Sequence, residues 1–341
     1  MSKVFLPTLD YLPRRGGVAR YLLAIKNTFP DVVDVLFWKN NPSRIKMFFD
    51  ILDGAKAHDQ IWTSHILPVG TIIWLTKSIH KKPYVVILHG LDFDLAIRNP
   101  WKRWITRRIL RGAKNIVTNS RALAREVIDF ASVSELIVVN PSLDDDLIKA
   151  SPADLSMKTK TETADHVITL LSVGRLIERK GHLKVLEAIK DLPNVHYCIV
   201  GDGIFKSRIE DKITELGLEE RCVISANVTD RELPAFYNSA DIFIMPTTKT
   251  KLDREGFGIV YLEAELFELP VIATNYPGID EAIIDKVTGF LVDNSVSEIR
   301  FAIEKLVADA ELRRRMGKAG RKFVLAGFTR EKQFRKLEDL L

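Results

Sequence analysis

The sequence predicts an α/β protein of two domains, each built on a parallel β-sheet. Three observations support this prediction. The chain has 341 residues, about twice the usual size of one domain. Short apolar runs alternate with amphipathic stretches throughout, as in βα units. Over residues 151–165 this alternation gives way to a polar segment rich in Thr and Lys, which is typical of an interdomain linker.

The first predicted domain spans residues 1–150. Its candidate strands are residues 32–36, 60–62, 84–88, 116–118 and 136–139. The run at 84–88 is apolar on both faces, which indicates a central strand of a parallel sheet. A helix is expected over residues 19–25, just after the glycine pair Gly16 and Gly17.

The second predicted domain spans residues 166–328 and repeats the alternation. Its candidate strands are residues 167–173, 196–200, 222–224, 242–245, 271–274 and 290–292. A helix is expected over residues 183–189, and a charged amphipathic helix over residues 329–341.

Composition indicates an intracellular protein without a structural metal. The two cysteines, Cys198 and Cys222, lie in apolar strands and are expected to be buried, so a disulfide framework or zinc site is not supported. No signal peptide is recognised at the N-terminus. The longest apolar run, residues 66–75, is too short to span a bilayer. We therefore expect a cytoplasmic protein that is not integral to a membrane.

A basic segment suggests a peripheral membrane contact. Residues 101–111 contain five basic residues and no acidic one, within a net charge of +5. Apolar side chains recur there with helical spacing at Trp101, Trp104, Ile105 and Ile109. Such a helix can lie on anionic lipid, together with residues 44–49. Alternatively, it packs its tryptophans inward and leaves its bases in solvent. A nucleic-acid partner is not favoured, because no recognition module accompanies the segment.

Two carboxylates, Glu255 and Glu263, form the most informative motif. Glu263 falls on the apolar stripe of a helix that begins near Ile259. A buried carboxylate needs hydrogen bonds, and no basic residue lies within one turn, so a hydroxyl or amide from the fold or a ligand is expected. Glu255 precedes the helix, whose N-terminus favours a phosphate. Two acids around a phosphate suit a sugar nucleotide, although a core acid and a solvated loop acid would give the same pattern.

Further candidate residues follow predicted strands, where open α/β sheets bind ligands. Arg175 and Lys180 can neutralise a diphosphate, or can form ordinary surface ion pairs. His89 follows the central strand at 84–88, where it is placed to meet a substrate. The Gly16–Gly17 pair allows a phosphate or sugar to approach the backbone. It is not a G-x-G-x-x-G motif, so a nicotinamide cofactor is not indicated.

Taken in order, these motifs resemble those of the retaining glycosyltransferases of family 4. The shared features are a Gly-Gly pair, a His-Gly after a central strand, Gly-Arg-x4-Lys-Gly, Gly-Asp-Gly at 201–203 and Glu-x7-Glu. The resemblance covers nearly the whole chain. It implies the GT-B fold, with two Rossmann-like domains facing a central cleft, and a C-terminal helix over 329–341 that crosses back to the first domain.

The resemblance also implies roles for individual residues. Arg175 and Lys180 match the family's diphosphate-binding pair, and Glu255 matches the acid that contacts the transferred sugar. Glu263 matches the acid that binds the ribose, and His89 the residue near the sugar. The remaining donor-binding positions are Gly16 and Gly17 over the diphosphate, the amides of Phe257, Gly258 and Ile259, and the backbone of Asn227 and Val228 at the base.

The expected activity is metal-independent, retaining transfer from a nucleoside diphosphate sugar to a glycan, lipid or lipid-linked acceptor. No Asp-x-Asp stands at a credible metal site, since residues 144–146 read as solvated. No cofactor other than the donor is expected. The sequence does not distinguish among UDP, GDP and ADP sugars as the donor, and it does not identify the acceptor. The alternatives are a sugar-nucleotide epimerase of the same architecture and a non-catalytic sugar-nucleotide-binding protein.

Overall fold

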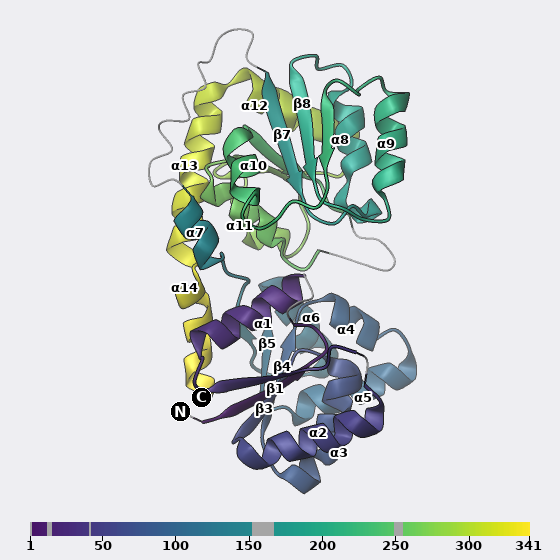
Figure 1. The fold of residues 1–341 in the computed structure, drawn as a ribbon, viewed down its shortest axis with the longest axis vertical. Helices are drawn as coiled ribbons and strands as arrows, with labels where there is room; N and C mark the ends of the chain where they lie inside the picture. Colours follow the sequence, from purple (N-terminus) through teal and green to yellow (C-terminus); the bar gives the residue numbers. More distant parts are fainter. Residues whose placement is uncertain (1, 12–15, 41, 152–166, 249–254) are drawn as a thin grey trace. The chain divides into compact units, whose positions relative to one another are not determined.

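The computed structural model describes residues 2–11, 16–40, 42–151, 167–248 and 255–341. The chain divides into two units (Figure 1). The first unit contains the residues up to Ser142 together with Thr329–Leu341, and the second contains Leu143–Phe328. Each has a six-stranded sheet in which every pairing is parallel, which confirms the predicted fold class. All of the predicted linker except Ser151 lies outside the described residues.

The sheet of the first unit has the order β2-β1-β3-β4-β5-β6. Its strands are β1 (Val4–Thr8), β2 (Val33–Phe37), β3 (Gln60–Thr63), β4 (Tyr84–Leu88), β5 (Asn115–Thr118) and β6 (Ile137–Val138). The sequence prediction lacks β1, although this strand pairs with both β2 and β3. Its apolar run is short, and Pro7 has no N–H to donate, so the local pattern does not indicate an internal strand.

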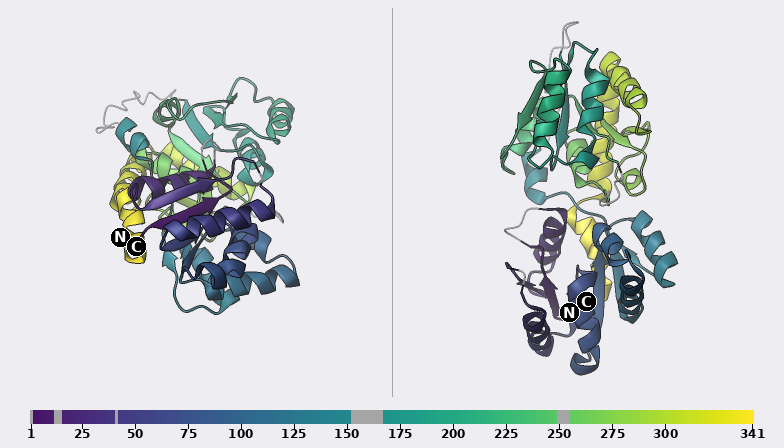
Figure 2. Two further views of the ribbon diagram at one scale, coloured as in Figure 1. Left: turned by 60° about the horizontal axis from the view of Figure 1, so that its bottom comes forward. Right: turned by 90° about the vertical axis from the view of Figure 1, so that its right-hand side faces the viewer.

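Helices cover both faces of this first sheet (Figures 1 and 2). One face packs against α2 (Arg44–Ala57), α3 (Thr71–His80) and α5 (Pro100–Gly112), and with them lie α4 (Leu91–Ala96) and α6 (Arg121–Ala131). The other face packs against α1 (Gly17–Thr28) and the C-terminal segment. That segment is α14 (Arg330–Phe334) followed by a 3₁₀ helix, Arg335–Leu340.

The C-terminal segment is held in the first unit by its apolar side chains and by its ends. Phe334 and Leu337 are fully buried beside α1. The Gln333 side-chain oxygen accepts a hydrogen bond of 2.9 Å from the Asn140 N–H. The Gln60 side chain donates to the Leu340 carbonyl over 2.8 Å. The last thirteen residues therefore complete a core to which the first strands of the chain contribute.

The sheet of the second unit has the order β12-β11-β10-β7-β8-β9. Its strands are β7 (Ile168–Val173), β8 (Val195–Val200), β9 (Cys222–Ser225), β10 (Ile242–Met245), β11 (Val271–Thr274) and β12 (Gly289–Val292). One face packs against α10 (Leu233–Ser239), α11 (Ile259–Leu266) and α13 (Ala310–Gly327), and α7 (Asp145–Ala150) adds to this core. The other packs against α8 (His182–Ile189), α9 (Lys206–Glu215) and α12 (Val296–Ala308). All six strands predicted for this half are present, with ends within one residue.

In the basic helix α5, the tryptophans do not pack inward beside the isoleucines with which they share the predicted apolar spacing. Ile105 and Ile109 are buried, whereas Trp101 is 64% and Trp104 51% exposed. The alternative in which both tryptophans pack inward is therefore wrong. Thr106 and Leu110 fill the inner face instead. In the described part of the chain, no helix is both long and apolar enough to cross a bilayer.

Glu265 is a buried carboxyl group in α11 that sequence reasoning did not single out. Its side chain is fully buried, and its Cγ lies 3.0 Å from where a Cβ on Gly320 of α13 would stand. Burial raises the pKa of Glu265 well above its usual value. The folded protein therefore holds this proton more tightly than the unfolded chain does.

We expect the free energy of unfolding to fall as the pH rises above the ordinary carboxyl pKa, by at most about 1.4 kcal/mol per pH unit from this group. In Glu265→Gln this contribution disappears. Urea denaturation between pH 5 and pH 8 measures it, with exposed Glu220→Gln as the control. Identical pH slopes for the wild type and Glu265→Gln would contradict this explanation.

Candidate functional site

A buried ion cluster stands between β7 and α8 in the second unit. Arg179 and Lys180 belong to the 3₁₀ turn Glu178–Lys180, which follows β7. The carboxylate oxygen Oε2 of Glu255 lies 2.6 Å from Nη1 of Arg179 and 2.7 Å from Nζ of Lys180. The three side chains are 7%, 9% and 14% exposed for Arg179, Lys180 and Glu255. The Glu255 carboxylate thus forms ion pairs with two cations that are largely shielded from solvent.

The electrostatics of this cluster keep its acid ionised. Burial opposes ionisation of Glu255, but the charges of Lys180 and Arg179 outweigh it and lower the pKa of Glu255 to about 2. Burial lowers the pKa of Lys180, and the Glu255 charge works against that shift. The cluster carries more positive than negative charge, so it can accept a further anion.

A glycine allows the turn to approach the neighbouring strand. Gly181 has a φ of 77°, and a Cβ there would stand 2.3 Å from the carbonyl oxygen of Pro246, just after β10. The Thr248 N–H also donates to the Arg179 carbonyl over 2.7 Å. Glycine is therefore required for the loops after β7 and β10 to meet and to fix the position of Lys180.

Glu263 lies on the buried face of α11, and its partner is a hydroxyl from the fold. The Tyr237 hydroxyl donates to Oε2 of Glu263 over 2.8 Å, and Glu263 is 2% exposed. The Tyr237 ring stacks on Phe267, with centroids 5.3 Å apart. Packing between α10 and α11 thus provides the hydrogen bond that the sequence argument required.

The N-terminus of α11 carries the other residues of the Glu-x7-Glu motif. Gly258 precedes the helix with a φ of 86°, and a Cβ there would collide with the Tyr261 ring at 2.4 Å. Phe257 is buried, and Ile259 is the first helical residue. Among the described residues, no side chain caps this helix end. Its first N–H groups can therefore bind an anion.

Three predicted residues lie at the edges of this region. Arg175 follows β7, is exposed, and acts on Lys180 through its charge. Asn227 and Val228 follow β9, and Asn227 is exposed with a left-handed φ of 58°.

The cation that sequence reasoning missed is Arg179. Its adjacency to Lys180 was the available signal, but helical spacing did not indicate that both would turn inward.

In the first unit, the predicted glycines leave an open helix end. Gly16 and Gly17 are exposed at the start of α1, and a Cβ on either would meet nothing within 4 Å. Packing within the described chain therefore does not require glycine at these positions. A ligand that approaches this backbone closely would require it.

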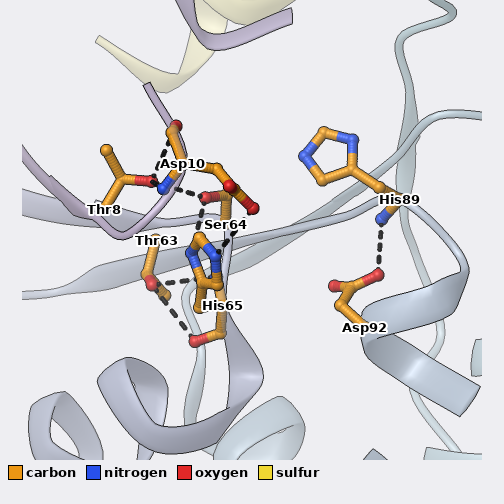
Figure 3. Close-up of polar contacts among 7 residues, drawn as sticks. All are labelled: Thr8, Asp10, Thr63, Ser64, His65, His89 and Asp92. Carbon is orange, nitrogen blue, oxygen red and sulfur yellow. Dashed lines mark hydrogen bonds and ion pairs between the residues drawn. The ribbon is translucent and has the colours of Figure 1, made fainter. Parts of the chain in front are cut away.

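His89 follows β4 and lies in a polar cluster (Figure 3). Burial lowers its pKa to about 3, so the imidazole is neutral. Its Nε2 is buried without a hydrogen-bond partner in the described part of the chain. The His89 N–H donates over 3.0 Å to Asp92, whose pKa burial raises to about 6.

The same cluster contains Asp10 and His65, which sequence reasoning also missed. Nε2 of His65 lies 3.4 Å from Oδ2 of Asp10, and Nδ1 lies 3.0 Å from the Ser64 hydroxyl. These residues follow the ends of β1 and β3. Because β1 was not predicted, nothing in the sequence indicated that Asp10 would lie at this edge of the sheet.

No group of three or more His, Cys, Asp or Glu side chains in the described ranges is arranged to hold a metal ion. The two cysteines do not pair with each other, and Cys222 is buried while Cys198 is half-buried. The cations and helix end of the second unit and the polar cluster of the first are candidate ligand-binding features of the described residues.

Two family models match the chain in adjacent segments. The model for glycosyl transferases group 1 matches residues 156–323. The model for glycosyltransferase family 4 matches residues 29–147. Together they cover most of both units.

Two curated relatives are glycosyltransferases by name, and one of them aligns over nearly the full length. The GDP-mannose-dependent alpha-(1-6)-phosphatidylinositol monomannoside mannosyltransferase of Mycolicibacterium smegmatis is 28% identical, over 99% of this chain and 98% of its own. The lipopolysaccharide core biosynthesis glycosyltransferase LpsE of Rhizobium meliloti is 30% identical over 65% of this chain and 62% of its own.

Solved structures share the fold. A sucrose-phosphate synthase from Thermosynechococcus elongatus superposes with a TM-score of 0.81 at 21% identity, covering 100% of this chain and 98% of that one. HepE from Anabaena, solved in complex with UDP-glucose, gives a TM-score of 0.81 at 20% identity, covering 100% and 99%. These likenesses confirm the predicted GT-B fold.

Proposed function

Since the chain belongs to the glycosyltransferases of group 1 and family 4, we propose that it transfers a sugar from a nucleoside diphosphate sugar to a glycan or lipid-linked acceptor, with retention at the anomeric carbon. The observation that carries this proposal is the Arg179–Lys180–Glu255 ion cluster in the unit that also presents the uncapped end of α11. Buried cations and free N–H groups are what a diphosphate requires.

The donor's diphosphate would bind Lys180 and Arg179, with Arg175 as an exposed third cation. Their attraction to Glu255 is then shared with the phosphates. The Glu255 carboxylate becomes available to accept hydrogen bonds from hydroxyls of the transferred sugar. Glu263 would bind the ribose, and the backbone of Asn227 and Val228 the base. Phe257, Gly258 and Ile259 would offer their amides to the sugar and the phosphates.

For the first unit, the family resemblance implies contacts with the donor's diphosphate and sugar. The open backbone at Gly16 and Gly17 suits close approach of a phosphate. His89 is neutral, so its imidazole can hydrogen-bond a sugar hydroxyl without a competing charge.

Breaking the bond between the anomeric carbon and the diphosphate leaves negative charge on the diphosphate. Lys180, Arg179 and the N-terminus of α11 stabilise that charge as it develops, because they are already oriented and largely dry. These groups supply the stabilisation for which many transferases use a divalent cation. We therefore propose metal-independent transfer.

Treatment with EDTA is expected to leave the initial rate of transfer unchanged, because side chains and a helix end carry the leaving-group charge. The rate is measured by release of nucleoside diphosphate from GDP-mannose or UDP-glucose, with and without EDTA. A loss of activity that added Mg²⁺ restores would contradict metal independence.

The relatives suggest which donors to test first. The mycobacterial relatives are named for GDP-mannose and for a phosphatidylinositol mannoside acceptor. HepE was solved with UDP-glucose. We propose a GDP- or UDP-sugar as donor and a glycolipid as acceptor.

A glycolipid acceptor agrees with a lipid-facing surface on the first unit. Helices α2, α3 and α5 pack side by side, and the outer sides of all three carry apolar residues. Six of these side chains expose between 51 and 72% of their surface: Ile45, Phe49, Leu75, Ile79, Trp101 and Trp104. Around them lie basic residues, among them Arg44, Lys46, Lys102, Arg103 and Arg108. We propose that this surface binds anionic lipid, which places the protein peripherally on the inner face of the cell membrane.

Changing both Phe49 and Trp101 to Ser is expected to reduce binding to vesicles that contain anionic lipid by about tenfold or more, because two exposed aromatic anchors are lost. Cosedimentation measures this at low salt, where charge attraction is strongest. Phe301→Ser removes an apolar side chain of α12 that is 54% exposed and serves as the control. Wild-type protein that stays in the supernatant at low salt would contradict the proposal.

A further inference from the structure

The first unit contains a pocket that is lined by the edge strand β2, the residues just after it and helix α2. Its volume is about 590 Å³, within the range of about 300–1,000 Å³ that small-molecule sites occupy. Its described lining shares no residue with the donor site proposed above. We call it the Trp38–Asp50 pocket.

Aromatic and aliphatic side chains form one part of this lining. They are Phe5 of β1, Leu36 of β2 and Trp38, and the two aromatic residues are buried in the core beneath α2. A Cβ on Gly54 of α2 would stand 2.4 Å from the Phe5 ring, so a larger residue there would displace the ring. Glycine at this position therefore lets α2 approach the sheet and keeps the apolar wall of the pocket in place.

A hydrogen-bond network orients the polar part of the lining. The Trp38 Nε1–H donates over 2.8 Å to Oδ2 of Asp50, and Nζ of Lys46 lies 3.0 Å from the same oxygen. Burial opposes ionisation of Asp50, but the hydrogen bonds from Trp38 and Lys46 outweigh it and lower the pKa of Asp50. A second carboxylate, Asp53, lies about one turn further along α2 and is exposed. The pocket thus offers an oriented acceptor within it and another at its rim.

The charges of the described lining balance, which favours a neutral ligand. Two cations, Lys39 and Lys46, and two carboxylates, Asp50 and Asp53, line the pocket. A phosphate would be repelled by both carboxylates, one of which already pairs with Lys46. A hydrocarbon chain would remove water from these charged groups without replacing its hydrogen bonds.

A ring with hydroxyl groups and an apolar C–H face matches both parts of the lining. A carboxylate has about four acceptor positions, and Asp50 uses part of them for Trp38 and Lys46. The remaining positions can accept hydrogen bonds from hydroxyls. The C–H face of the ring can pack on the Trp38 and Phe5 side chains. Sugars and cyclitols are rings of this kind.

The pocket adjoins the lipid-facing surface proposed above, because both use helix α2. Lys46, Asp50 and Asp53 line the pocket at helical spacing, whereas Ile45 and Phe49 are exposed and belong to the lipid-facing surface. Ile45 and Phe49 each precede a pocket residue by one position, which is a rotation of about 100° around the helix. A ring in the pocket would therefore lie beside side chains that contact the bilayer.

We propose that the Trp38–Asp50 pocket binds a neutral sugar or cyclitol ring carried by a membrane lipid; this inference rests on the lipid-facing surface and glycolipid acceptor of the proposed function. Hydroxyls of the ring donate to Asp50 and Asp53, and its C–H face packs against Trp38. The basic residues around the lipid-facing surface attract any anionic lipid. The pocket adds a selection among lipids by their headgroup, which charge alone does not supply.

The test compares vesicles that contain phosphatidylinositol with vesicles that contain the same fraction of phosphatidylglycerol. The two lipids carry the same charge, but only the first presents a cyclitol ring. Cosedimentation of the wild type is expected to give a Kd about tenfold lower for phosphatidylinositol, because hydroxyls bind the carboxylates. Asp50→Asn and Asp53→Asn are each expected to reduce this difference. Asp129→Asn, which removes an exposed acid of α6 and changes the net charge equally, is expected to keep it.

Methyl α-mannoside and myo-inositol, followed by saturation-transfer difference NMR, distinguish a free ring from a lipid-borne one. Signals that Asp50→Asn abolishes and Asp129→Asn keeps, without a preference between the vesicles, would support the ring and overturn its lipid source. The inference as a whole is overturned if the wild type shows neither a vesicle preference nor ring signals. It is also overturned if both pocket variants retain the wild-type behaviour.

These measurements separate failure of the pocket from failure of the proposed function. None of them uses a donor, so the ring-binding result holds even if the protein neither binds a nucleotide nor transfers a sugar. Wild-type protein that binds neither kind of vesicle would contradict the lipid-facing surface, and the NMR measurement would then decide whether the pocket binds a ring.

Discussion

Replacing Glu255 with Gln is expected to abolish sugar transfer while strengthening the binding of a nucleoside diphosphate. Glu255 now neutralises two largely buried cations, Arg179 and Lys180, at 2.6 and 2.7 Å. Its removal takes away a counter-charge that both cations share, which costs about 3 kcal/mol of folding stability. A diphosphate then binds these cations without competition from Glu255. Transfer is lost because the sugar hydroxyls lose their charged partner, an effect of about 100-fold or more.

The measurement is urea denaturation of the wild type and Glu255→Gln, with and without GDP and UDP, beside the initial rate of transfer. The variant should be less stable alone and should gain more from the nucleotide than the wild type does. Glu220→Gln, an exposed acid of the same unit, is the control. A variant that is as stable as the wild type, or one that loses nucleotide binding, would contradict the competition between Glu255 and the diphosphate.

Glu263→Gln is expected to weaken nucleotide binding while leaving the binding of inorganic pyrophosphate unchanged. The carboxylate accepts a hydrogen bond from Tyr237 through Oε2 and is proposed to accept ribose hydroxyls as well. A hydrogen bond to a charged group contributes about 1.5–3 kcal/mol, so the Kd for GDP or UDP should rise about tenfold to 100-fold. The glutamine keeps the volume of the side chain and avoids a cavity beside Tyr237.

Calorimetric titration with nucleoside diphosphate and with pyrophosphate makes the comparison. Because pyrophosphate has no ribose, its Kd measures the contribution of Lys180, Arg179 and the end of α11 alone. Equal losses for the two ligands would mean that Glu263 supports the site as a whole. In that case Glu263 is a buried acid whose hydrogen-bond partner is Tyr237, and the proposed contact between Glu263 and the ribose is contradicted.

The positions of Lys180 and Glu255 near one another can be predicted from the sequence, because ligand-binding residues of open α/β sheets follow their strands. A hydroxyl or amide partner for Glu263 can be predicted as well, since a buried carboxylate without one is costly. The identity of that partner depends on how α10 packs on α11, which no local pattern encodes. Arg179 was not predicted as a site residue for a related reason. Only the tertiary contact with Glu255 shows that both adjacent cations, Arg179 and Lys180, turn inward.

In the first unit, sequence reasoning found His89 but not the residues around it. Strand β1 is internal to the sheet, yet its short apolar run with Pro7 does not indicate a strand. Without β1, Asp10 cannot be placed at the end of the sheet beside His65. Likewise, helical spacing put the tryptophans of α5 on the stripe of Ile105 and Ile109. The structure buries the isoleucines and leaves Trp101 and Trp104 exposed, because Thr106 and Leu110 complete the inner face.

The most direct test of a donor site in the second unit is thermal unfolding of the wild type with GDP, UDP and ADP in the presence of EDTA. A ligand at about a hundred times its Kd stabilises a protein by roughly 2.7 kcal/mol. We predict that one of the three nucleotides raises the Tm in this way without a metal ion and that its sugar form does the same. If no nucleotide raises the Tm, the assignment of Lys180, Arg179, Glu255 and Glu263 to the donor is contradicted.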